Sequence, residues 1–236
     1  MTDQGFIRSL PVRLDPQQEA AVLGTEGPAL LLAVPGSGKT TVLVARLGYL
    51  IQCRGVDPRQ ILTVTYTVAA AGDMRRRFLE LFGGRLEAPP FRTIKGLCAS
   101  IIDRYAARRG TVPFQLAGSE GRLDAVLRDL LVRTGTARPT EQQIRDARTQ
   151  ITYCKNMLLT EEEIHGRQVE GMDFPAVYFE YQDFLRRSRL MDYDDQMVFA
   201  LRILRRDPEL LAWYQRRYRY LCLDEAQDTF KIQHVI

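Results

Sequence analysis

The chain has 236 residues, of which 45% are hydrophobic and 26% are charged, and these values are ordinary for a soluble globular protein. Its net charge of +4 permits a polyanionic partner but is too small to indicate one alone. The four cysteines include no CxxC pair, so we expect reduced thiols in a cytoplasmic protein, with no secretory signal and no membrane-spanning run.

The first predicted helix follows Leu14. Asp15 suits the N-cap position, Pro16 suits the first helical position, and Gln18 falls three residues after the cap. Gln18 therefore has two interpretations. It can complete a capping box, which the segment alone favours, or its amide can read adenine through a two-way hydrogen bond.

The strongest chemical pattern lies between residues 29 and 52. An apolar strand is predicted at Ala29–Val34, a glycine-containing loop follows, and a helix is predicted from Lys39 to Gln52. The glycines let backbone N–H groups approach phosphate oxygens, and the helix directs the positive end of its dipole at the same anion. Lys39 would reach the β- and γ-phosphates, and the Thr40 hydroxyl would ligate Mg²⁺. The predicted phosphate-binding residues are Ala33, Val34, Pro35, Gly36, Ser37, Gly38, Lys39, Thr40 and Thr41.

An α/β pattern continues beyond the loop. A buried strand rich in β-branched residues is predicted at Ile61–Tyr66, and a helix ended by Gly83 and Gly84 follows it. Next comes a short strand at Phe91–Thr93, and then an apolar stripe at helical spacing from residue 94 to 105. The order of these elements favours a parallel sheet covered by helices.

The pattern changes between residues 110 and 190, where strand signals disappear and helices repeat. Thr140 and Thr160 each begin a predicted capping box, and we interpret the region as an all-helical insertion into an α/β domain. The acidic run Asp192–Asp195 that follows could hold a metal or begin a helix. Leu190 and the spacing of the first and last aspartates suit a staple and a capping box, so the helix start is preferred.

The last predicted strand is Tyr220–Leu223, which we expect to be buried, and two acidic residues follow it. Asp224 would hold Mg²⁺, and Glu225 would orient and deprotonate the attacking water. Ligands of open α/β sheets bind beyond the carboxyl ends of the strands, where both this pair and the glycine loop fall. Together they predict an enzyme that hydrolyses a nucleotide with Mg²⁺.

Taken in order, these motifs resemble those of the UvrD/Rep/PcrA-like superfamily 1 DNA helicases, and the likeness covers nearly the whole chain. The segments that carry it are Gln18, 33–41, 65–67, 93–97, 192–195 and 224–229. The resemblance implies a RecA-like P-loop NTPase sheet, interrupted by an all-helical subdomain, and ATP-driven 3′-to-5′ translocation on single-stranded DNA. It also implies that Gln18 reads adenine, against the preference of its own segment.

The resemblance further implies which residues contact single-stranded DNA. Thr65, Tyr66 and Thr67 match one DNA-contacting segment of the family, while Thr93 and Lys95 fall in another. Tyr66 can stack on a base, and Lys95 can meet a phosphate. The phosphate chemistry is intact but the DNA-contacting segments are altered. The departures are Glu19 for Arg, Val34 for Gly, Val68 and Ala69 for Asn-Lys, Lys95 for His, Gly96 for Ser and Phe230 for Asn.

The resemblance divides the chain into a RecA-like ATP-binding domain at 1–109 and 191–236, and a helical subdomain at 110–190. The sheet is expected to be incomplete at its C-terminal end, because the family continues with a γ-phosphate-sensing strand and a second RecA-like domain. We therefore expect the N-terminal part of an ATP-dependent 3′-to-5′ DNA helicase, whose remainder follows Ile236 and which has no membrane partner.

Two other classes remain open at this point. One is a regulatory module that binds nucleotide or DNA without turnover, and the other is a different P-loop enzyme. The isolated chain is expected to hydrolyse ATP negligibly.

Overall fold

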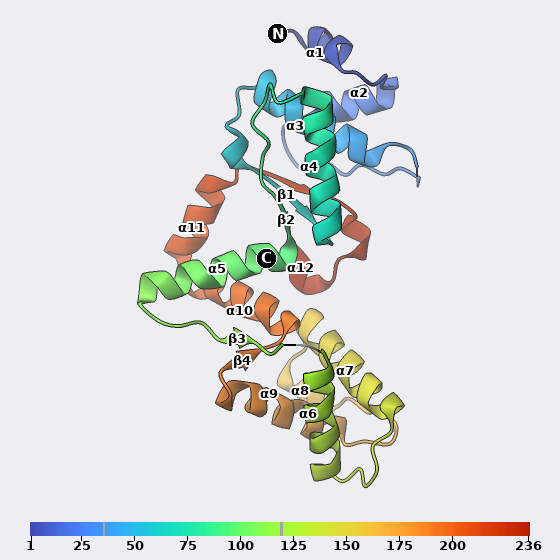
Figure 1. Ribbon diagram of the computed structural model, residues 1–236, viewed down its shortest axis with the longest axis vertical. Coiled ribbons are helices and arrows are strands. Elements are labelled where there is room, and N and C mark those ends of the chain that lie inside the picture. Colours follow the sequence, from blue (N-terminus) through green and yellow to red (C-terminus); the bar gives the residue numbers. More distant parts are fainter. Residues whose placement is uncertain (35, 119) are drawn as a thin grey trace. The chain divides into compact units, whose positions relative to one another are not determined.

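The computed structural model describes residues 1–34, 36–118 and 120–236, apart from the side chains of Glu120 and Asp228. The chain forms two compact units (Figure 1). The first comprises Met1–Ile94 and Glu209–Asp228, and the second comprises Lys95–Pro208 and Thr229–Ile236. The chain thus leaves the first unit and returns to it. The family domain bounds expected above, at residues 109 and 190, stay a prediction.

The first unit is built around a small parallel sheet with the strand order β2-β1-β5. Thr65 of β1 lies opposite Thr93 of β2, and Val64 lies opposite Leu223 of β5, so the three carboxyl ends share one edge. The elements of this unit are α1 (Asp3–Ser9), α2 (Pro16–Leu23), α3 (Lys39–Gln52), η1 (Pro58–Gln60), β1 (Ile61–Thr65), α4 (Val68–Phe82), β2 (Phe91–Thr93), α11 (Pro208–Arg217), β5 (Tyr220–Leu223) and η2 (Ala226–Asp228).

The core of the first unit joins α1, α3 and α4 to β1. Phe6, Tyr49 and Phe82 are buried there, with the Phe6 ring centroid 5.3 Å from that of Tyr49 and 6.3 Å from that of Phe82. Gly48 lets the Phe82 ring approach α3 closely, because a Cβ at this glycine would lie 1.9 Å from a ring carbon of Phe82. This packing holds α3, and with it the loop that precedes the helix, against the rest of the unit.

The predicted strand at Ala29–Val34 is not formed. Residues 29–34 have no strand partner, and Leu30 and Leu32 are 76% and 82% exposed. β5 lies at an edge of the sheet, and its Leu221 is 67% exposed, so the expectation of a buried last strand was also wrong. A strand is held by its ladder, and within the described residues nothing pairs with this segment or with the outer side of β5.

The second unit is mainly helical. Its core lies between α6, α7 and α9, where Leu131, Ile144 and Phe174 are buried. A strand-free region was expected, yet β3 and β4 pair in parallel over two residues each, too few to leave a sequence pattern. The elements are α5 (Ile94–Arg109), β3 (Gln115–Leu116), α6 (Glu120–Arg133), α7 (Glu141–Asn156), α8 (Glu161–His165), α9 (Phe174–Arg187), β4 (Leu190–Met191), α10 (Tyr193–Arg206) and α12 (Lys231–Val235).

The predicted helix starts are confirmed. Capping boxes are formed at Asp15, Thr140, Thr160 and Asp192, each with its partner side chain three residues later. Within the described part of the chain, none of the helices is both long enough and apolar enough to cross a bilayer.

Candidate nucleotide-binding site

Two glycines shape the loop before α3. Gly36 and Gly38 have φ angles of 80° and 83°, a left-handed conformation that strains any residue with a side chain. The 14-residue helix α3 begins at Lys39, and no described side chain caps its first turn. Its first N–H groups can therefore serve an anion, which the helix dipole also favours. Pro35, which the sequence places in this loop, lies outside the described residues.

The loop closes on the carbonyl oxygen of Val34. The backbone N–H and the hydroxyl of Ser37 both donate to this oxygen, at 3.2 and 2.7 Å. The Lys39 ammonium lies 3.4 Å from the same oxygen and 3.3 Å from that of Ala33. The flexible stem of this lysine brings its charge to the mouth of the loop, within reach of a bound anion. Thr40 and Thr41 lie half-buried in the first turn of α3.

Gln18 makes two contacts, one of which the sequence predicted. Its Oε1 accepts a hydrogen bond from the Asp15 N–H at 3.0 Å, which completes the cap of α2. Its Nε2 donates at 3.0 Å to the carbonyl oxygen of Ser37, which lies 19 residues away in the chain. The cap is thus confirmed, and the same side chain also touches the glycine loop. The contact with the loop depends on the fold and leaves no local signal in the sequence.

The acidic pair lies directly after β5. The Asp224 N–H donates to the Val64 carbonyl at 3.1 Å, which extends the ladder to β1 by one bond. Burial and the neighbouring Glu225 charge raise the pKa of Asp224 above its ordinary value, and the Lys39 charge acts in the opposite direction. Lys39 and Asp224 are therefore close enough for their charges to interact.

Glu225 has an unusual backbone conformation. Its φ angle is 53°, in the left-handed region that non-glycine residues rarely occupy. Its exposed carboxylate accepts a hydrogen bond from the side-chain amide of Gln227. Sequence reasoning missed this contact of Gln227, because the spacing of the two residues carries no signal for it.

The predicted DNA-contacting residues after β1 differ in their availability. The buried Thr65 hydroxyl donates to the Thr67 carbonyl at 3.0 Å, and the Thr67 hydroxyl accepts from the Ala70 N–H at 3.1 Å and so caps α4. The Tyr66 side chain is 55% exposed. The predicted Thr93 ends β2 directly opposite Thr65.

Lys95 meets an aromatic residue that was not predicted. Its ammonium lies 4.6 Å from the centroid of the Tyr193 ring, and this tyrosine is 52% exposed at the start of α10. The aspartates around Tyr193 suit capping or metal binding, and nothing in the sequence distinguishes the tyrosine ring between them. An exposed ring beside a cation is a typical feature of surfaces that bind single-stranded nucleic acid.

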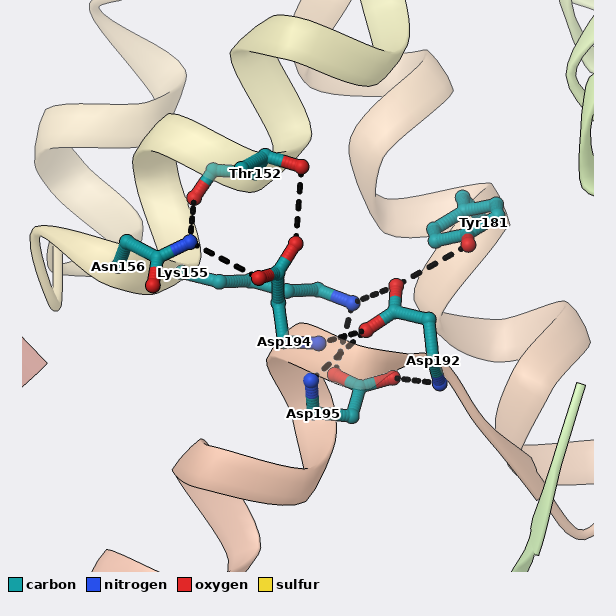
Figure 2. A network of polar contacts seen from close by, with 7 residues as sticks. All are labelled: Thr152, Lys155, Asn156, Tyr181, Asp192, Asp194 and Asp195. Carbon is teal, nitrogen blue, oxygen red and sulfur yellow. Dashed lines mark hydrogen bonds and ion pairs between the residues drawn. The ribbon is translucent and has the colours of Figure 1, made fainter. Parts of the chain in front are cut away.

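The acidic run before α10 forms a charge cluster with Lys155 of α7 (Figure 2). The buried Lys155 ammonium lies 2.6 Å from Asp192 and 2.7 Å from Asp195. Tyr181 of α9 donates to Asp192 at 3.1 Å, and Asn156 of α7 donates to the third carboxylate, that of Asp194, at 2.9 Å. The helix-start interpretation is therefore confirmed. No group of three or more possible metal ligands occurs among the described His, Cys, Asp and Glu residues.

The two carboxyl groups that touch Lys155 differ in their pKa. Burial raises the pKa of Asp192, but the charge and hydrogen bond of Lys155 outweigh burial, and the result lies below the ordinary value. Burial also raises the pKa of Asp195, and there the neighbouring Asp192 charge adds to burial, so that pKa stays above its ordinary value. The cluster is thus an internal ion pair with one carboxyl group in excess.

Known proteins resemble this chain over nearly its full length. It is 32% identical over 235 residues to a protein of Staphylococcus epidermidis named ATP-dependent DNA helicase PcrA, covering 98% of this chain and 32% of that relative. It is also 32% identical over 228 residues to the Staphylococcus aureus protein of the same name, covering 94% of this chain and 31% of the relative. The chain thus spans about a third of the length of these relatives. A sequence model of the UvrD/REP helicase N-terminal domain matches residues 14–236, so the chain belongs to the UvrD/REP helicase N-terminal domain family.

Proposed function

We propose that this chain is the ATP- and DNA-binding N-terminal part of an ATP-dependent 3′-to-5′ DNA helicase. One observation carries the proposal. The glycine loop with Lys39 and the acidic strand end at Asp224 belong to the same compact unit, and their charges interact. A cationic phosphate loop facing a carboxylate is the arrangement that nucleotide hydrolysis needs. Membership of a helicase family supports ATP as the nucleotide and argues against an unrelated P-loop enzyme.

We assign the residues of the site as follows. The backbone of residues 33–38 and the first turn of α3 hold the phosphates, and Lys39 contacts the β- and γ-phosphates. Gln18 contacts adenine as well as the loop. Glu225 accepts the proton of the attacking water, and the amide of Gln227 orients its carboxylate.

The residues present suit a magnesium ion. Thr40 and Asp224 offer a hydroxyl and a carboxylate, which are the hard oxygen ligands that Mg²⁺ prefers. Burial and the neighbouring Glu225 charge raise the pKa of Asp224, and a bound cation would favour the charged form of this carboxyl group. When bound, Mg²⁺ would supply charge neutralisation at the phosphates, while Thr40 and Asp224 hold it.

For DNA binding we assign separate roles to side chains and backbone. Tyr66 offers an exposed ring for a base, and Lys95 with Tyr193 offers a cation beside a second ring. The hydroxyls of Thr65 and Thr67 already serve the loop and the cap of α4, so we propose that these residues act mainly by holding Tyr66 in place. Thr93 keeps the assignment that the family resemblance gives it.

The proposed architecture is a RecA-like domain at 1–109 and 191–236, with a helical subdomain at 110–190. We propose that this chain is part of a longer protein, called here the natural protein. In it a further strand lies beside β5 and completes the sheet with residues 29–34. The unpaired outer side of β5 and the exposed apolar residues Leu30 and Leu32 support this, because that strand would pair with both segments and bring residues 29–34 into the sheet. The relatives' greater length leaves room for it and for a second RecA-like domain beyond Ile236.

Strand displacement by the natural protein tests this function. We expect ATP-dependent unwinding of a duplex with a 3′ single-stranded tail, little unwinding with a 5′ tail, and none by the Lys39→Ala variant. Equal unwinding of both substrates would contradict the direction, and equal unwinding by the variant would contradict the ATP site.

A further inference from the structure

We propose that Gln18 positions the phosphate loop through the Ser37 carbonyl, independently of any contact with adenine. The inference rests on the nucleotide site proposed above and adds to it a role that concerns the phosphates. Its starting point is the 3.0 Å hydrogen bond from Gln18 Nε2 to the Ser37 oxygen, across 19 residues of chain.

The bond fixes the orientation of one peptide group. In a trans peptide the C=O and the N–H point in opposite directions, so holding the Ser37 oxygen on the α2 side turns the Gly38 N–H to the other side. Gly38 directly precedes α3, so this N–H belongs to the set that a phosphate would use. If the peptide turned over, a carbonyl oxygen would face the anion in place of a donor.

The loop needs an external restraint of this kind. Gly36 and Gly38 both adopt left-handed φ angles, and glycine moves between such conformations at little cost. The Ser37 hydroxyl and N–H and the Lys39 ammonium bond to carbonyls of residues 33 and 34, so these contacts stay within the loop. Gln18 connects the loop to a separate helix.

Helix α2, which carries Gln18, is itself held in place by hydrogen bonds. The Asp15 carboxylate accepts hydrogen bonds from the backbone N–H groups of residues 17 and 18. In turn, the Gln18 Oε1 accepts a hydrogen bond from the Asp15 N–H. Arg46 of α3 donates to the Ala21 carbonyl at 2.7 Å, which joins α2 to α3 at a second point. Gly38 leaves the space for Gln18, since a Cβ at Gly38 would lie 3.3 Å from its Nε2.

This role makes a prediction that adenine reading alone does not make. A ligand with phosphates and no base should lose affinity when Gln18 is truncated. The probe is inorganic tripolyphosphate with Mg²⁺, compared with ATP and Mg²⁺ by titration calorimetry on the natural protein. We expect Gln18→Ala to weaken tripolyphosphate binding about fivefold, the effect of one neutral hydrogen bond, and to weaken ATP binding further.

Two controls separate the loop contact from helix stability. Gln17→Ala removes a neighbouring exposed amide of the same helix and should leave both affinities unchanged. Asp15→Ala removes the cap of α2 but keeps the Gln18 amide that donates to the Ser37 carbonyl. It should therefore change tripolyphosphate affinity less than twofold. If Asp15→Ala matched Gln18→Ala, the effect would come from the helix cap, and the inference would be wrong.

The remaining outcomes are distinct. A Gln18→Ala variant that loses ATP affinity but binds tripolyphosphate like the parent would overturn this inference and leave the proposed function in place. A parent protein that binds neither ligand would overturn both. Hydrogen exchange without ligand gives an independent measurement. Amides 36–39 should exchange faster in Gln18→Ala than in Gln17→Ala, and equal exchange would contradict the restraint.

Discussion

Replacing Lys155 with methionine should destabilise the second unit strongly. The substitution keeps an unbranched apolar stem but removes the charge that lies 2.6 and 2.7 Å from Asp192 and Asp195. Removing one partner of a buried ion pair costs about 3–5 kcal/mol, because the other partner stays buried without compensation. For a chain of this size a loss in this range lowers the unfolding temperature by roughly 10 °C.

The loss should depend on pH, with a defined sign. In the parent, the lowered pKa of Asp192 contributes stability above its unfolded pKa, and this contribution is lost as pH falls through the folded value. Without Lys155 both carboxyl groups are buried with no counter-charge, so the folded pKa of Asp192 rises above its unfolded value and that of Asp195, already raised in the parent, rises further. The stability of the variant then falls as pH rises through those values, and the difference from the parent grows from acid to neutral pH.

Urea denaturation of parent and variant near pH 4.5 and near pH 8 measures both effects. Arg186→Met is the matched control, since Arg186 pairs with Asp183 on the exposed surface of the same unit and should cost no more than about 0.5 kcal/mol. A loss below about 1 kcal/mol for Lys155→Met, or a loss independent of pH, would refute the reasoning that the buried pair holds α7 to α10.

Three further predictions concern the site and the core. In the natural protein, Glu225→Gln should bind ATP normally but hydrolyse it at least a hundredfold more slowly, because an amide cannot accept the proton of water; parental turnover would exclude Glu225 as the base. Tyr66→Ala and Lys95→Ala should each weaken single-stranded DNA binding, and rising salt should weaken it in the parent; equal affinity for blunt duplex in the same titration would contradict the DNA assignment. Gly48→Ala should cost about 1–3 kcal/mol by clashing with a ring 1.9 Å away, whereas Gly72→Ala, with open space in α4, should stabilise by up to about 1 kcal/mol; equal effects in denaturation would contradict the packing.

Local signals predicted the helices well, and the reasons are physical. α3 begins and ends at the predicted residues, because a left-handed glycine precedes it and its apolar stripe packs on the core. α10 begins where the spacing of Asp192 and Asp195 placed a capping box. A helix satisfies its own backbone and a cap lies within four residues, so the sequence of the segment holds most of the information.

The strand at residues 29–34 was predicted wrongly for the converse reason. Its apolar pattern suits a buried strand, but a strand requires a neighbour to bond with, and within the described residues it has none. The local sequence therefore indicated that the segment can form a strand, but it could not determine whether a neighbouring strand is present to pair with it.

The polar contacts of Lys155 and of Gln18 could not be predicted from the residues that neighbour them in the sequence. Lys155 stands 37 residues before Asp192, and Gln18 stands 19 residues before Ser37, so only the fold brings these pairs together. Tyr193 was overlooked because its acidic neighbours offered a sufficient structural explanation, and its contact with Lys95 spans distant parts of the chain.

The measurement that tests the central claim most directly is ATP hydrolysis by the natural protein, with and without single-stranded DNA, in the parent and in Lys39→Ala. The Lys39 ammonium contacts the loop carbonyl of Ala33, and its charge lowers the pKa of Asp224. We predict hydrolysis that DNA stimulates in the parent and that falls to background in the variant. Hydrolysis that continues at the parental rate in Lys39→Ala would contradict the assignment of this loop as the ATP site.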